Sequence, residues 1–108
     1  MNGKWAIITG ASSGIGKALA FEFAAGGFHL VLIARNETAL AEVAAECARR
    51  NRIEADIIAA DLSRPDALDV LTSELASKPR RYEVLVNNAG FPSTGISLPQ
   101  TSSRTFSS

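Results

Sequence analysis

The chain of 108 residues is long enough for one small domain, and 46% apolar residues suffice for a hydrophobic core. Eleven basic residues balance eleven acidic ones without a basic run, which argues against nucleic acid as a partner. No apolar run approaches the ~20 residues that cross a bilayer, and the N-terminus lacks a signal-peptide pattern. We therefore expect a cytoplasmic protein with no membrane partner.

Strand and helix patterns alternate through residues 1–90. Continuous apolar runs predict four strands that are buried on both faces, over 5–9, 29–34, 54–60 and 82–87. Helical periodicity between them predicts three helices, over 15–25, 37–50 and 63–76. This alternation predicts an α/β fold, a doubly wound parallel sheet of about four strands in the spatial order 3-2-1-4.

The helices carry local signals of their faces and ends. An apolar stripe is expected on each of the first two, formed by Ile15, Ala18, Leu19 and Phe23 in one and by Leu40, Val43, Ala44 and Cys47 in the other. Gly26 and Gly27 predict the end of the first helix. Ser63, followed by Pro65 and Asp66, predicts a capped start of the third.

The character of the sequence changes after Gly90. Half of residues 91–108 are Ser or Thr, and they show no helical or strand period. We expect residues 1–90 to form the domain and residues 91–108 to be an irregular or disordered tail.

The most informative segment, Thr9 to Gly16, holds three glycines between a predicted strand and a predicted helix. Gly10 allows the sharp turn, Gly14 lets the backbone approach a phosphate, and Gly16 lets the helix pack closely on the strand. The backbone N–H groups from Ser12 and Ser13 to Ile15 would then hold a diphosphate at the positive end of the helix. The alternative is a glycine-rich turn that binds nothing.

Two further strand ends lie at the carboxyl edge of the predicted sheet, where the glycine loop also lies and where doubly wound sheets bind ligands in a crevice. Arg35 follows the second strand, where it either pairs with a ribose 2′-phosphate or faces water. Asp61 follows the third strand, where it either accepts the adenine amino group or bonds loop backbone, and Leu62 beside it could pack on the adenine ring.

The fourth strand ends in a small-residue segment, Asn87-Asn88-Ala89-Gly90, which leaves room for a ribose and offers amides that tie strand ends together. The lone Cys47 is expected to be a core residue, and the single His29 has no partner that suggests a metal site.

Together, the three motifs resemble the short-chain dehydrogenase/reductase family over residues 1–91. Thr9 to Gly16 fits its Thr-Gly-x-x-x-Gly-x-Gly cofactor loop, Asp61-Leu62 its adenine-contacting position, and residues 87–90 its Asn-Asn-Ala-Gly motif. The resemblance implies a Rossmann sheet, NAD(P) binding, and hydride transfer between a nicotinamide and an alcohol or carbonyl. The expected cofactor-binding residues are Gly10, Ser12, Ser13, Gly14, Ile15, Gly16, Arg35, Asp61, Leu62, Asn88, Ala89 and Gly90.

Arg35 resembles the arginine of NADP-preferring members, so NADP(H) is the expected cofactor and NAD(H) the alternative. Ser13 stands where such members often carry a second basic residue. The family's catalytic Tyr and Lys, four residues apart, follow its Asn-Asn-Ala-Gly motif. The one tyrosine here is Tyr82, with Val86 four residues later, so we assign no catalytic residue.

The sequence thus predicts the N-terminal half of a reductase, as a truncated or frameshifted product or a fragment. In that case strand 82–87 would be an unpaired edge, and apolar area on one face of the sheet would be exposed, which predicts self-association. Three functions stay open: the nucleotide half of an oxidoreductase, a non-catalytic nucleotide-binding module, and an inert fragment.

Overall fold

The computed structural model describes residues 3–78, 80–88 and 104–107. A parallel sheet has the order β3-β2-β1-β4-β5. Its strands are β1 (Lys4–Thr9), β2 (His29–Ala34), β3 (Ala55–Ala59), β4 (Arg81–Asn87) and β5 (Arg104–Ser107). The helices are α1 (Gly14–Ala25), α2 (Glu37–Asn51) and α3 (Ala67–Ala76). The predicted order of the first four strands, 3-2-1-4, is confirmed.

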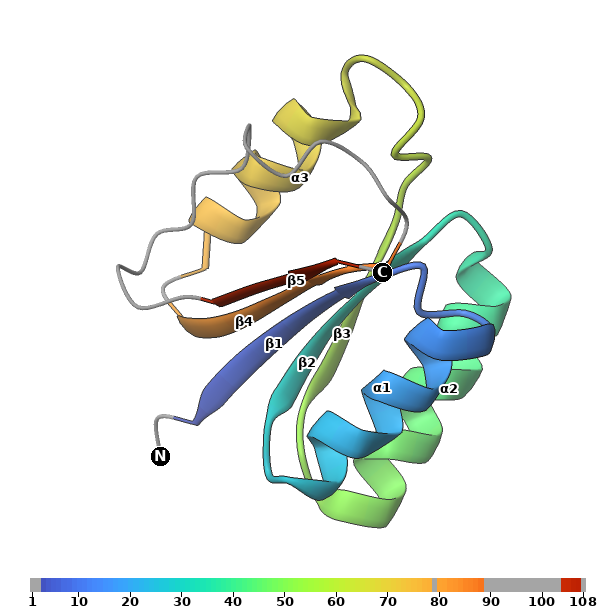
Figure 1. Cartoon of the computed structure of the whole chain (residues 1–108), viewed down its shortest axis with the longest axis vertical. Coiled ribbons are helices and arrows are strands. Elements are labelled where there is room, and N and C mark those ends of the chain that lie inside the picture. Colours follow the sequence, from blue (N-terminus) through green and yellow to red (C-terminus); the bar gives the residue numbers. More distant parts are fainter. Residues whose placement is uncertain (1–2, 79, 89–103, 108) are drawn as a thin grey trace.

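Helices cover both faces of the sheet, with α1 and α2 on one side and α3 on the other (Figure 1). Successive residues of β1 therefore enter different cores. Ala6 and Ile8 pack in the cluster beneath α1 and α2, whereas Trp5 and Ile7 pack in the cluster beneath α3. Burial of β1 on both faces explains why its sequence is a continuous apolar run.

The predicted stripe of α1 is wrong at Ile15 and Ala18, which are exposed, whereas Leu19 and Phe23 are half-buried against the core. The buried residues of α1 are Gly16, Ala20 and Ala24, whereas Ile15 is 62% exposed. Four-residue spacing from Gly16 places these small residues on the face toward the sheet, so α1 lies close to it. In α2 the predicted stripe is confirmed, because its buried residues are Leu40, Val43, Ala44 and Cys47.

The start of α3 also differs from the prediction. The helix begins at Ala67, and its N-cap residue Asp66 makes no side-chain cap hydrogen bond. Ser63 does not cap it, because the Ser63 hydroxyl donates to Asp61 Oδ1 at 2.6 Å. The segment between β3 and α3 is therefore held by Asp61, and the helix starts one turn later than its sequence signals suggest.

Part of the predicted irregular tail is a strand. Residues 104–107 form β5, which pairs with β4 in the register Val84↔Arg104 to Asn87↔Ser107. The prediction that strand 82–87 is an unpaired edge is therefore wrong. A free strand edge presents unpaired N–H and C=O groups, and β5 supplies partners for those of β4. The rest of the tail, 91–103 and 108, lies outside the described residues, as do residues 89 and 90 of the predicted domain.

The face beneath α3 is more closed than the sequence predicts. Among the described residues its core side chains are at most 6% exposed, and the one large exposed apolar side chain on this side is Val70 of α3, at 52%. None of the described helices is long and apolar enough to span a membrane.

A charged cluster closes this core at the amino ends of the strands. The Arg80 guanidinium lies 3.8 Å from the centre of the Trp5 ring and forms an ion pair with Asp56 of β3. Lys78 Nζ lies 3.3 Å from the same carboxylate oxygen. Burial raises the pKa of Asp56, but the hydrogen bonds and charges of Arg80 and Lys78 outweigh it, so the pKa lies below its ordinary 3.8.

We expect Asp56→Asn to lower the free energy of unfolding at pH 7 by about 1 kcal/mol, a modest value because the carboxylate is 35% exposed. A pKa lowered in the folded state stabilises above pH 3.8, and this stabilisation is lost as the pH falls through the folded pKa. Urea unfolding from pH 7 to pH 3 should show wild type and variant converging. A constant difference would contradict the assignment, and exposed Glu22→Gln is the control.

Candidate nucleotide-binding site

The glycine loop lies at the carboxyl end of β1 and leads into α1. Gly10 has a φ of +63° and Gly14 a φ of +60°, in the left-handed region that favours glycine. Between them, the Ala11 N–H donates to the carbonyl of Ile33 at the end of β2, at 3.3 Å. The loop is thus fixed both by its own backbone and by the neighbouring strand.

Gly16 makes the closest contact in the site. A Cβ atom there would overlap the carbonyl oxygen of Gly10 and lie 2.7 Å from its carbonyl carbon. The same Cβ would lie 2.9 Å from Asn88 Nδ2, which donates to the Gly10 carbonyl at 3.3 Å. The role predicted for Gly16, close packing of helix on strand, and the tie expected from an Asn at the end of the fourth strand are both seen here.

Gly14 has the opposite environment. A Cβ built on Gly14 meets no described atom within 4 Å, so it faces open space. Ser13 and Ile15 beside it are exposed, and Ser12 is half-buried. A large apolar side chain that is 62% exposed at the start of a helix is available to contact a ligand.

The amino end of α1 is electrostatically different from that of α2. Asn36 caps α2 by accepting the Ala39 N–H at 3.0 Å, and Glu37 supplies an acid in its first turn. Ser13 makes no side-chain cap hydrogen bond, and the first turn of α1 contains no acid. The first-turn N–H groups and the positive end of the dipole of α1 are therefore suited to an anion.

Polar side chains tie the carboxyl ends of β1 and β4 together. The buried Thr9 hydroxyl lies 3.3 Å from the Val86 carbonyl and 3.5 Å from Asn87 Oδ1. Sequence reasoning did not assign this role to Thr9. The available signal was a hydroxyl residue that ends an apolar run directly before Gly10.

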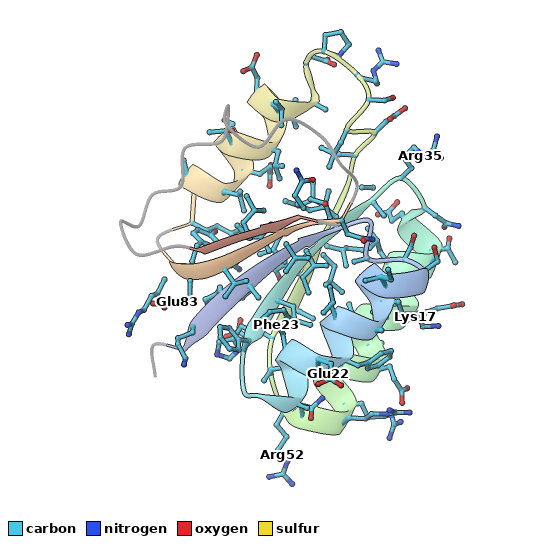
Figure 2. The ribbon with its side chains drawn as sticks, viewed as in Figure 1. Lys17, Glu22, Phe23, Arg35, Arg52 and Glu83 are labelled. Carbon is cyan, nitrogen blue, oxygen red and sulfur yellow. The ribbon has the colours of Figure 1, made fainter. Side chains whose placement is uncertain are left out.

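Arg35 and Asp61 lie on the same rim, after β2 and β3. Arg35 is exposed and extends outward from the turn after β2 (Figure 2). Asp61 Oδ1 accepts the Ser63 N–H at 3.0 Å and the Ser63 hydroxyl at 2.6 Å, which lowers the pKa of Asp61; Arg35 and Arg64 lower it further. The loop-bonding role expected as one alternative for Asp61 is present, and its adenine contact stays a prediction.

The remaining expected site residues are Leu62, Ala89 and Gly90. Leu62 is half-buried against the core beneath α3, and Ala89 and Gly90 lie outside the described residues.

Cys47 is buried in the core, and burial raises the pKa of its thiol. Within the described part of the chain, no group of three His, Cys, Asp or Glu side chains could hold a metal ion.

Residues 4–107 match the family described as short chain dehydrogenase. The chain belongs to this family. Among curated relatives, very-long-chain 3-oxoacyl-CoA reductase of Candida albicans is 39% identical over 89 residues, 82% of this chain and 26% of the relative. The human protein named inactive hydroxysteroid dehydrogenase-like protein 1 is 43% identical over 88 residues, with the same two coverages.

Solved structures agree with this assignment. The short-chain dehydrogenase from Sphingobium yanoikuyae in complex with NADPH has a TM-score of 0.74 and 39% identity, over 81% of this chain and 34% of that one. L-sorbose reductase from Gluconobacter frateurii, complexed with NADPH and L-sorbose, has a TM-score of 0.76 and 39% identity, over 82% and 34%. The chain thus spans about a quarter to a third of the length of these short-chain dehydrogenases.

We expect Gly16→Ala to destabilise the fold by about 3 kcal/mol or more, because the new methyl group would overlap backbone atoms of Gly10 that cannot move away cheaply. Gly26→Ala is the matched control, since its Cβ would meet nothing closer than 3.5 Å and its φ is −81°. Thermal unfolding of both variants checks the expectation. Equal stability of the two would show that the contact at Gly16 is not constraining.

Proposed function

We propose that this chain forms the NADP(H)-binding part of a short-chain dehydrogenase-type oxidoreductase. One observation carries the proposal. The amino end of α1 has no side-chain cap, and a Cβ built on its first residue, Gly14, would meet only open space. A pyrophosphate accepts hydrogen bonds from such free N–H groups and is favoured by the helix dipole. Two structural neighbours named as NADPH complexes support the choice of a nicotinamide dinucleotide.

The preference for NADP(H) over NAD(H) rests on Arg35. Its side chain is exposed, and no described acidic side chain forms an ion pair with it. A guanidinium group binds a phosphate through charge-assisted hydrogen bonds, whereas an acid at the end of the second strand would favour an unphosphorylated ribose.

The reaction proposed for the family fold is hydride transfer between the nicotinamide and an alcohol or carbonyl. In this chain the single tyrosine is not suited to exchange the substrate proton. Tyr82 is fully buried, its hydroxyl donates to the Leu75 carbonyl at 3.1 Å, and burial raises the pKa of the phenol. We therefore propose that this chain supplies nucleotide binding and no catalytic proton donor.

A second candidate function is a nucleotide-binding module without catalysis. The 43% identity to a human relative whose name marks it as inactive favours this candidate. Hydride-transfer assays of the chain with NADPH and a panel of ketones and aldehydes test both candidates, and each predicts no turnover by the chain alone. Turnover by the chain alone would contradict both the second candidate and the assignment of Tyr82 as structural.

We expect Arg35→Asp to reverse the ratio of NADPH to NADH affinity, with a change of at least about tenfold, because the new carboxylate repels the 2′-phosphate and accepts the ribose hydroxyl. Energy transfer from Trp5, the only tryptophan, to the reduced nicotinamide reports binding of both nucleotides. An unchanged ratio would mean that Arg35 does not touch the phosphate.

We expect Gly14→Val to abolish binding of either nucleotide, because the side chain would fill the space proposed for the pyrophosphate and strain a φ of +60°. Isothermal titration calorimetry measures the binding, and circular dichroism verifies the fold of the variant. Retained affinity in a folded Gly14→Val protein would exclude the loop as the diphosphate site. A folded wild type that gives no heat with any pyridine dinucleotide would support an inert chain instead.

A further inference from the structure

Two arginines lie on the rim formed by the carboxyl ends of β2 and β3. The strands are in register as far as Ala34 and Ala59, and the Ala60 N–H donates to the Ala34 carbonyl at 2.9 Å. This register places Arg35 opposite Ala60, the residue directly before Asp61. Arg35 is thus close to the turn that contains the second arginine, Arg64.

The turn after β3 folds Arg64 back toward Asp61. The Arg64 N–H donates to the Asp61 carbonyl at 3.1 Å, and Ser63 holds the Asp61 carboxylate from within the same turn. The hydrogen bonds from Ser63 lower the pKa of this carboxyl most, and the charges of Arg35 and Arg64 lower it further. Both arginines are therefore near enough to this anchored carboxylate for their charges to act on it.

Neither arginine is strongly engaged by the protein. The Arg64 side chain is 69% exposed, and its described acidic partner Asp66 is 72% exposed at 3.8 Å, a separation and exposure at which an ion pair is weak. Asp61 already accepts two hydrogen bonds from Ser63, so its carboxylate is held within the turn. Two weakly paired cations on adjacent loops suit an anion of about two charges, such as a phosphate monoester.

We propose that Arg64 is a second determinant of cofactor choice, and that Arg35 and Arg64 together bind the 2′-phosphate of NADP(H). Arg64 supplies the second cation of the site from the turn after β3. The glycine loop supplies none, because Ser13 stands where a second basic residue would be expected. This inference rests on the proposed function, because it assumes that the adenosine end of the nucleotide lies on this rim.

The test compares adenosine 2′,5′-bisphosphate with adenosine 5′-monophosphate, two probes that differ only in the 2′-phosphate. Calorimetric affinities are measured for wild type, Arg64→Gln, Arg35→Gln and the double variant at low and moderate salt. Arg52→Gln is the matched control, because Arg52 is also exposed and lies at the opposite end of the molecule from Arg35 (Figure 2). All four substituted proteins are checked for an unchanged thermal unfolding midpoint.

We expect Arg64→Gln to weaken the bisphosphate about fivefold, to leave the monophosphate within about twofold, and to reduce the salt dependence of bisphosphate binding. The double variant should lose less than the two single losses combined, since both side chains share one phosphate. If Arg64→Gln behaves like Arg52→Gln, or weakens both probes equally, the inference is overturned while the proposed function stands. If folded wild type binds neither probe, the proposed function fails together with the inference.

Discussion

The close contact of Gly16 with the Gly10 carbonyl is the constraint on which the candidate site depends. It brings the first turn of α1 against the end of β1, and Asn88 from the end of β4 donates to the same carbonyl. Because Gly16 is fixed in this way, Ala20 and Ala24 face the sheet and Ile15 faces outward. The same contact thus determines both how α1 packs and which groups it presents to a ligand.

The charged groups at the two ends of the sheet differ in whether the protein itself supplies them with partners. At the amino ends, Arg80 forms an ion pair with Asp56 and lies over the Trp5 ring, and these contacts close the core beneath α3. At the carboxyl ends, the positive end of α1 lacks a cap, and Arg35 extends outward. An ion pair that is already formed contributes to stability, whereas groups without a strong partner can contribute to binding. This division agrees with the placement of ligands outside the carboxyl ends of strands in doubly wound sheets.

The sequence predictions that were wrong share one cause. Ile15 belongs to an apolar stripe by its spacing, but the contact of Gly16 with Gly10 leaves it facing outward. Ser63 belongs to a capping pattern by its neighbours, but its hydroxyl donates to Asp61 instead. Local periodicity contains neither contact. The strand at 104–107 is a further example. Its residues show no strand period, and their pairing depends on the edge that β4 presents, about twenty residues earlier in the chain.

The sequence by itself determined the order of the first four strands, the buried face of α2 and the place of the glycine loop, because apolar periodicity, turn residues and crossover handedness are local or topological properties. Only the tertiary structure decided the rotation of α1, the anchoring of Asp61 by Ser63 and the choice of the Gly10 carbonyl as the group that Gly16 and Asn88 both contact. These depend on which atoms of distant segments come within a few ångströms of one another. Such contacts are set by packing of whole elements, which no single segment of sequence encodes.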